Sequence, residues 1–221
     1  MFNNIYKDKK VLVTGHTGFK GTWLTTWLLK LGANVVGMSK DIPTTPSMFE
    51  ELKIRGKIKH YQEDIRDLSK VSEIITSEKP DFLFHLAAQA IVSTSYISPI
   101  ETITSNVIGT ANILEALKEL NHKCTAIIIT SDKAYDNVEQ VWGYKEDDKM
   151  GGRDIYSGSK GAAELIIKSY YHSFFTNKDS NIKLAIGRAG NVIGGGDWAE
   201  NRIVVDCMES WSYKKVVEIR N

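Results

Sequence analysis

Residues 11–23 read VLVTGHTGFKGTW, an apolar β-branched run that leads through three glycines into a segment of helical period. A strand, a glycine turn and a helix in this order are typical of a dinucleotide-binding unit. Gly15 allows the tight turn, Gly18 lets the backbone approach a pyrophosphate, and Gly21 lets helix and strand pack closely. The free N–H groups at the start of the helix favour an anion there. The stretch therefore predicts the binding of a dinucleotide phosphate.

Short apolar runs alternate with segments of helical period along the rest of the chain. Strands are expected at residues 11–13, 35–36, 82–84, 127–129 and 184–186. Apolar helix faces are expected at Trp23, Leu24, Trp27, Leu28 and Leu31, at Val71, Ile74 and Ile75, and at Val107, Ile113, Leu114 and Leu117. Continuously apolar strands belong inside a parallel sheet. The sequence therefore predicts an α/β fold with a doubly wound parallel sheet of Rossmann type.

The composition indicates a globular protein with small partners. The 221 residues are 42% hydrophobic, and 28 basic against 27 acidic residues give a net charge of +1, so we expect no nucleic-acid partner. No apolar stretch reaches the roughly 20 residues that span a bilayer, and the polar start lacks a signal-peptide core. We therefore expect a cytoplasmic protein without membrane contact. Cys124 and Cys207 lack metal-type spacing, so we expect no metal and two buried thiols.

Tyr156 and Lys160 are four residues apart, which places them on one face of a helix. A tyrosine base needs a nearby positive charge because the pKa of free tyrosine is about 10. Tyr6 and Lys10 repeat this spacing before the first strand, so spacing alone does not identify a site. Ser131, in contrast, follows a later strand, at the end where doubly wound sheets bind ligands. Position along the chain therefore favours Tyr156 and Lys160 as a catalytic pair.

The glycine spacing, Gly-x-x-Gly-x-x-Gly, resembles that of the extended short-chain dehydrogenase/reductase superfamily. The resemblance implies an NAD cofactor whose adenosine ribose is bound by a carboxylate after the second strand. Asp41 lies two residues beyond the usual position of that carboxylate, which is close to Ser39, so a preference for NADP stays open. The cofactor residues implied by the resemblance are Gly15, His16, Thr17, Gly18, Phe19, Lys20, Gly21, Asp41, Asp64, Ile65, Leu86, Ala87, Ala88, Gln89, Asn106, Tyr156 and Lys160.

Residues 130–133, TSDK, narrow the resemblance to the sugar-nucleotide 4,6-dehydratases. Together with VWGY at 141–144 and NVIGGGDW at 191–198, they are similar to the CDP-glucose type. The resemblance implies that CDP-glucose, or a related nucleotide sugar, becomes a 4-keto-6-deoxy product. The implied catalytic residues are Ser131 at the C4 oxygen, Asp132 as the acid for water loss, Lys133 as the base at C5 or an enolate stabiliser, Tyr156 as the base at the C4 hydroxyl, and Lys160.

The resemblance places the sugar nucleotide on later residues as well. Arg188 and Asn191 match a substrate loop, Arg202 offers a phosphate contact, and Ser131 contacts the sugar.

We expect an NAD-binding domain over residues 1–187 and the start of a substrate-binding domain over 188–221, with a strand at 216–219. Because members of the family continue past this point, we expect a truncated chain that retains the cofactor site and binds CDP-glucose weakly or not at all. The resemblance also implies a homodimer or homotetramer that pairs through helices near 104–119 and 156–171.

Two other functions stay open. A sugar-nucleotide 4-epimerase would share the glycine loop and the Tyr156/Lys160 pair but has no use for Asp132 followed by Lys133. A non-catalytic dinucleotide-binding module would use the glycine loop alone, and the intact catalytic residues argue against it.

Overall fold

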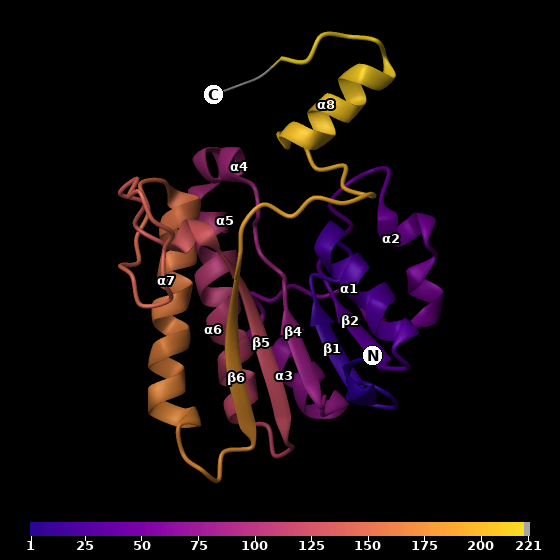
Figure 1. Cartoon of the computed structure of the whole chain (residues 1–221). Coiled ribbons are helices and arrows are strands. Elements are labelled where there is room, and N and C mark those ends of the chain that lie inside the picture. Colours follow the sequence, from indigo (N-terminus) through magenta and orange to yellow (C-terminus); the bar gives the residue numbers. More distant parts are fainter. Residues whose placement is uncertain (219–221) are drawn as a thin grey trace.

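Six parallel strands form one sheet in the order β3-β2-β1-β4-β5-β6 (Figure 1). A computed structural model describes residues 1–218 of the chain. The strands are β1 (Lys10–Thr14), β2 (Asn34–Met38), β3 (Lys59–Tyr61), β4 (Phe82–His85), β5 (Cys124–Ser131) and β6 (Ile182–Ala189). Each neighbouring pair runs in parallel. The predicted doubly wound parallel sheet is confirmed.

Helices connect the strands and cover the sheet. The α-helices are α1 (Phe19–Lys30), α2 (Met48–Glu51), α3 (Leu68–Glu78), α4 (Val92–Ile97), α5 (Pro99–Ile103), α6 (Gly109–Lys118), α7 (Ile155–Tyr170) and α8 (Ile203–Ser212). Three 3-10 turns are η1 (Phe2–Asn4), η2 (Ile54–Lys57) and η4 (Asp132–Ala134), and two π-helical turns are η3 (Thr104–Ile108) and η5 (Tyr171–Phe175). Within residues 1–218, no helix is both long and apolar enough to cross a membrane.

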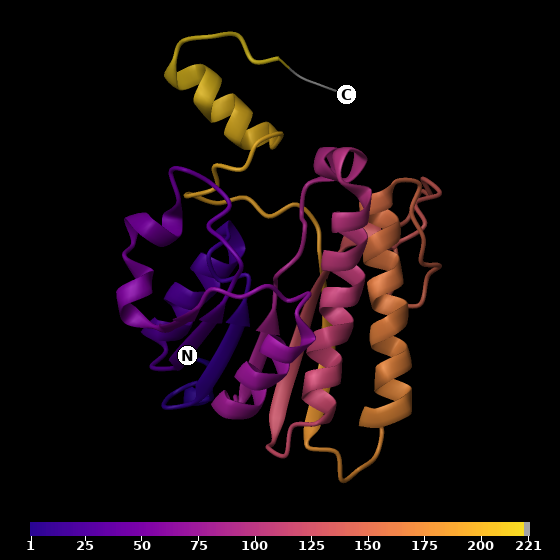
Figure 2. The ribbon, with the colours of Figure 1, turned by 180° about the vertical axis from the view of Figure 1, so that it is seen from behind.

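The two faces of the sheet carry separate apolar cores because strand side chains alternate between the faces. Leu12 and Val36 belong to the larger core, which they share with residues of α3, α6 and α7. Figure 2, which views the molecule from behind, shows these three helices side by side in front of the sheet. Val11, Val13 and Val35 face the other way and pack with residues of α1. The alternation therefore fixes which helices lie on which face.

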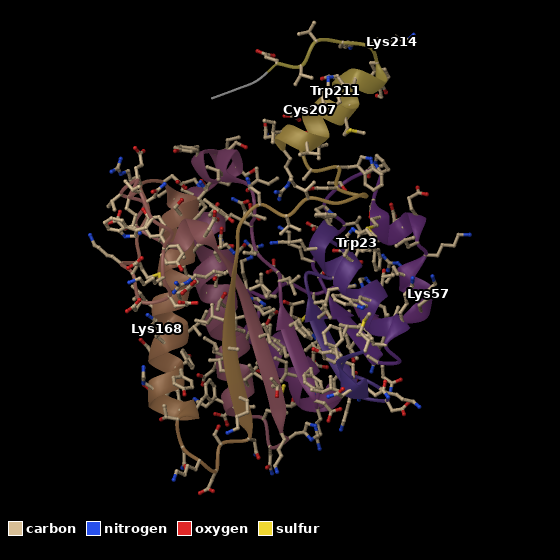
Figure 3. The ribbon with its side chains drawn as sticks, in the orientation of Figure 1. Trp23, Lys57, Lys168, Cys207, Trp211 and Lys214 are labelled. Carbon is tan, nitrogen blue, oxygen red and sulfur yellow. The ribbon has the colours of Figure 1, made fainter. Side chains whose placement is uncertain are left out.

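The prediction of the apolar face of α1 is wrong for Trp23 and Trp27. Trp23 and Trp27 are 49% and 48% exposed, whereas the helix buries Gly21, Thr22 and Leu28. Small side chains face inward because the helix approaches the glycine loop closely. The Trp23 indole instead donates a hydrogen bond to the Gly195 carbonyl oxygen at 2.9 Å, in the segment between β6 and α8 (Figure 3).

The ends of the sheet and of the chain also differ from expectation. β3 was not predicted, because Lys59–Tyr61 is short and polar and forms an edge strand. Residues 216–218 form no strand, and Ile219 lies outside the described residues. Before them, α8 stands above the carboxyl ends of the strands and carries the half-buried Cys207 (Figures 1 and 3). Only Cys124 is buried, so the expectation of two buried thiols is wrong for Cys207.

The glycine loop makes a prediction about stability. A Cβ atom at Gly21 would lie 2.1 Å from the Gly15 carbonyl oxygen and 2.7 Å from His16 Cα. Both neighbours are backbone atoms, so α1 must shift, and we expect Gly21→Ala to lower the free energy of unfolding in urea by roughly 1–3 kcal/mol. Gly158→Ala in α7 is the matched control, because no atom lies within 4 Å of its added Cβ. Equal stability of the two variants would contradict this account.

A chain of buried polar groups crosses the larger core beneath the loop. His85 at the end of β4 contacts the Thr14 hydroxyl at 2.7 Å and the Thr110 hydroxyl at 3.1 Å. Thr14 also accepts the Ala87 N–H, and Thr110 donates to the Asn106 carbonyl oxygen. Complete burial, and secondarily the charge of Lys160, lowers the pKa of His85 to about 3. A neutral His85 therefore joins β1, β4 and the first turn of α6.

The neutral histidine makes stability depend on pH. His85 has a pKa of about 3 in the folded chain against 6.5 as its ordinary value, so below pH 6.5 the unfolded chain binds a proton that the folded chain refuses. The His85 contribution is therefore complete above pH 6.5 and is lost as pH falls toward 3. Between about pH 5 and pH 6, we expect His85→Gln to reduce the slope of unfolding free energy against pH by about 1.2 kcal/mol per pH unit. Urea titrations at several pH values measure the slope, with exposed His172→Gln as control; an unchanged slope in His85→Gln would rule out a neutral buried His85.

Candidate active site

A cavity of about 1250 Å³ opens at the carboxyl ends of β1, β4 and β5. It lies where the strand order reverses between β1 and β4, which is the general ligand position in doubly wound sheets (Figure 1). Of the residues singled out from the sequence, the cavity is lined by Gly15, Thr17, Gly18, Phe19, Lys20, Gly21, Asp41, Asp64, Ile65, Leu86, Ala87, Ala88, Gln89, Ser131, Asp132, Lys133, Tyr156, Lys160, Asn191 and Arg202. The fold thus gathers segments that are distant in sequence around one space.

His16 lies beneath the glycine loop and does not line this cavity. It is fully buried, with Nδ1 3.0 Å from the Ser39 hydroxyl and Nε2 2.8 Å from Nδ1 of His60. Burial, with a smaller effect of His60, lowers the pKa of His16 to about 4. His16 therefore supports the turn from below as a neutral ring.

Asn106 also lies behind the cavity wall. Its side-chain oxygen accepts the Gln89 N–H at 2.9 Å, and its amide nitrogen donates to the Gln89 carbonyl oxygen and to the Ser159 hydroxyl. Asn106 thereby ties the loop after β4 to α7, between Tyr156 and Lys160.

Arg188 is held by a buried carboxylate and does not line the cavity. Its guanidinium binds Glu164 of α7 through Nε at 2.8 Å and NH2 at 2.6 Å, and lies 4.5 Å from the centre of the Tyr135 ring. Glu164 is 0% exposed and also accepts the Thr130 hydroxyl at 2.7 Å. The ion pair therefore fastens α7 to the ends of β5 and β6, next to Ser131.

The glycine loop has the shape that a dinucleotide phosphate requires. A Cβ at Gly15 would lie 2.7 Å from the backbone nitrogen of Ala87, so only glycine lets β1 turn there. At Gly18 the atom closest to an added Cβ, the Gly15 carbonyl oxygen, is at an ordinary contact distance of 3.5 Å, and Gly18 lines the cavity. Gly18 precedes α1, whose first turn has no side-chain cap and no acidic residue. Free N–H groups at an uncapped helix start in a cavity fit a phosphate.

Tyr156 and Lys160 lie on the cavity side of α7, as the sequence predicted for a helical segment. The Asp154 carboxylate caps the helix by accepting the Ser157 N–H, which places Tyr156 in the first turn. Tyr156 is 8% exposed and Lys160 7%, and Lys160 Nζ lies 5.8 Å from the centre of the tyrosine ring. Tyr6 and Lys10, the chance match, lie near the opposite ends of the strands, where Tyr6 packs on Phe82.

Burial acts on both ionisable groups of this pair. It lowers the pKa of the Lys160 ammonium to about 8, with a smaller contribution from the charge of Lys20. Burial also raises the pKa of Tyr156, which the Ser131 hydroxyl partly offsets and the Asp132 carboxylate reinforces. In the chain alone, Tyr156 is therefore protonated at neutral pH, and further positive charge near its oxygen would be needed for it to act as a base.

Ser131, Asp132 and Lys133 end β5 and begin a 3-10 turn beside this pair. The Ser131 hydroxyl donates to Asp132 Oδ1 at 3.0 Å and accepts the Lys133 N–H at 3.2 Å. Asp132 and Lys133 are exposed to the cavity. The side chain of Lys133 thus lacks the burial that would help a lysine act as a base.

Several lining residues were not predicted as site residues. Asp197 pairs with Arg202, with 3.4 Å between Oδ2 and Nε, and both belong to the segment that leads to α8. Lys40 and Glu101 form an ion pair at the other end of the cavity. No sequence pattern brings residues 40 and 101 together, whereas Asp197 stands in the quoted NVIGGGDW motif. Among residues 1–218, no three His, Cys, Asp or Glu side chains come together as metal ligands.

Comparisons with known proteins agree with this geometry. The family model of GDP-mannose 4,6 dehydratase matches residues 12–185. The chain is 47% identical over 221 residues to CDP-glucose 4,6-dehydratase of Salmonella typhimurium, an alignment that covers 99% of this chain and 62% of that enzyme. The chain therefore spans less than two thirds of the length of this relative.

Solved structures show the same fold. UDP-glucuronic acid 4-epimerase from Bacillus cereus, in complex with UDP-glucuronic acid and NAD, is 26% identical with a TM-score of 0.79, over 94% of this chain and 64% of that chain. UDP-glucose 4-epimerase from Thermotoga maritima, with UDP-glucose, is 24% identical with a TM-score of 0.82, over 96% and 66%. The resemblance inferred from the glycine loop and residues 130–133 is confirmed, and the chain belongs to the GDP-mannose 4,6-dehydratase family of the extended short-chain dehydrogenases/reductases.

Proposed function

We propose that this protein is a lyase that converts CDP-glucose to CDP-4-keto-6-deoxyglucose with bound NAD. The observation that carries the proposal is the meeting of Asp132 and Lys133 with Tyr156 and Lys160 in one cavity beside the glycine loop. The 47% identity to the Salmonella CDP-glucose 4,6-dehydratase supports the same substrate. A C4 epimerase would need the tyrosine and lysine but would leave Asp132 and Lys133 without a role.

The residues around the cavity fit NAD along its length. The N–H groups at the start of α1 would hold the pyrophosphate, and Asp41 and Asp64 line the end where the adenosine would lie. Lys160, at the other end, would hold the nicotinamide ribose. NAD bound there would supply the hydride acceptor for oxidation at C4 and the hydride donor for reduction at C6.

The side chains near Tyr156 then divide the proton transfers. Tyr156 takes the proton of the C4 hydroxyl while Ser131 hydrogen-bonds the C4 oxygen. Oxidation at C4 acidifies C5, so the C5 proton passes to solvent water in the open cavity. Asp132 donates a proton to the departing C6 hydroxyl, which leaves as water, and C5 regains a proton from water when the hydride returns to C6. Because the Lys133 side chain is exposed to the cavity beside Asp132, we assign it to stabilising the enolate that forms between C4 and C5.

The segments after β6 would bind the sugar nucleotide. Asn191 and Arg202 line the cavity, whereas Arg188 acts through Glu164 and keeps β5 in place. We retain residues 1–187 as the cofactor domain and 188–221 as the start of the substrate domain, with β6 crossing the boundary to Ala189.

We also infer that the protein pairs through its α5–α7 face. Ile100 and Ile103 of α5, Ile108 of η3 and Leu165 of α7 are exposed apolar side chains. Helices α5 and α7 contact each other, so these side chains can contribute to one surface. A homodimer through two such faces would bury them.

Incubation of the 221-residue chain with NAD and CDP-glucose tests the function. A 4-keto-6-deoxy product, detected by its absorbance in alkali, is expected. A C4 epimer would establish the epimerase instead, and NAD binding without any turnover would favour the non-catalytic module.

Asp132→Asn separates the two halves of the reaction. We expect the elimination step to slow about 100-fold or more, the size of a general-acid contribution, while C4 oxidation slows much less. Single-turnover NADH absorbance reports the oxidation, and product formation reports the elimination. Asp136→Asn is the matched control, because Asp136 pairs with Lys149 and does not line the cavity. Equal slowing of both steps by Asp132→Asn would remove Asp132 from the role of acid.

A further inference from the structure

The adenosine end of the cavity has an excess of carboxylates. The carboxylates that line this end are Asp41, Glu63, Asp64 and Glu101. Among the described residues, Lys40 is the one cation that lines it. Lys20, Lys133, Lys160 and Arg202, the other lining cations, belong to the glycine loop, the end of β5, α7 and the segment before α8. A group that binds beyond β2 therefore meets a net negative surface.

Glu101 forms ion pairs with the two cations near this end, Lys40 and Arg66. Its Oε1 accepts a hydrogen bond from Lys40 Nζ at 2.9 Å and lies 3.9 Å from NH1 of Arg66. The Lys40 ammonium holds the pKa of Glu101 below its usual range, as a direct ion pair should. Glu101 comes from the first turn of α5, whereas Lys40 follows β2. The pair therefore spans two loops of the cavity.

Arg66 is also engaged on its other side. Its Nε lies 2.9 Å and its NH2 2.6 Å from Asp64 Oδ2, and its backbone N–H donates to Asp64 Oδ1. Asn112 fixes this loop by donating to the carbonyl oxygens of Ile65 and Arg66. The guanidinium is thus held between two carboxylates.

We propose that Glu101 is a specificity-determining residue that makes the site select a dinucleotide with a free adenosine 2′-hydroxyl over one with a 2′-phosphate. The inference rests on the proposed binding of a dinucleotide with its adenosine ribose beyond β2. Ser39 stands at the end of β2, and its hydroxyl is already hydrogen-bonded to His16. A 2′-phosphate carries between one and two negative charges near neutral pH and requires a free Lys or Arg close by. Glu101 removes that option by occupying Lys40 and one side of Arg66.

The proposed role of Glu101 differs from that of a carboxylate that binds the ribose hydroxyls. Asp41 has the usual task of binding ribose hydroxyls, yet its Oδ2 is 3.8 Å from Lys40 Nζ and its side chain is mostly exposed. Discrimination against the phosphate therefore comes from α5, in a part of the chain distant from the β2 loop.

Calorimetric titration of the 221-residue chain with NAD and with NADP, without substrate, tests the inference. We expect the wild-type chain to bind NAD more tightly than NADP. In Glu101→Gln, we expect the Kd for NADP to fall about tenfold, because one close charge pair is released, while the Kd for NAD changes much less. High salt should reduce the gain in NADP affinity, since the freed charges are partly exposed.

Two variants keep the outcome specific. Glu63→Gln removes the same charge from the same end, but Glu63 is not paired with Lys40 or Arg66, so its effect on NADP affinity should be less than half that of Glu101→Gln. Lys40→Met added to Glu101→Gln should cancel most of the gain. Unchanged NADP affinity in Glu101→Gln, or equal gains in both glutamate variants, would overturn the role of Glu101. Failure of the wild-type chain to bind either dinucleotide would instead overturn the proposed cofactor function.

Discussion

The site exists because the chain passes over opposite faces of the sheet on the two sides of β1. The connection from β1 to β2 carries α1 over one face of the sheet, and α3 leads from β3 to β4 on the other face. The loops that follow β1 and β4 therefore separate and leave a cavity at their ends. The same loops approach so closely at their base that Gly15 has no room for a Cβ beside Ala87. The two loops therefore meet tightly at their base, and the cavity opens between them above it.

A single face of α7 carries both the catalytic groups and their support. Tyr156, Lys160 and Glu164 follow one another at intervals of four residues, so they lie in line on the helix. Glu164 is fully buried and accepts hydrogen bonds from Thr130 and from the largely buried Arg188, and a buried carboxylate is costly without such partners. That requirement fixes the position of α7 against the end of β5. Ser131 and Asp132 are consequently placed relative to Tyr156 by a contact outside the cavity.

The sequence predicted the features that depend on neighbouring residues and missed those that depend on tertiary partners. The apolar strands, the glycine loop and the helical spacing of Tyr156 and Lys160 are local patterns, so they could be read directly. The exposure of Trp23 could not, because the closeness of α1 to the loop, rather than the hydrophobicity of its residues, decides which face turns inward. Arg188 is assigned to substrate by its motif, but its contacts depend on Glu164. The ion pair of Lys40 with Glu101 joins residues far apart in the sequence, so no local sequence pattern predicts it.

The distribution of charge along the cavity gives its two ends different chemistry. Lys20, Lys133, Lys160 and Arg202 line the end where hydride transfer and the sugar diphosphate are proposed, together with carboxylates such as Asp132 and Asp197. Burial, and secondarily a neighbouring cation, lowers the pKa of both Lys160 and Lys20. A phosphate bound at that end would have these cations available as hydrogen-bond donors. Carboxylates gather at the opposite end, where a neutral ribose can donate hydrogen bonds to them without charge repulsion. The two ends therefore offer an asymmetric dinucleotide different partners, with lysine and arginine side chains near its phosphates and carboxylates near its adenosine ribose.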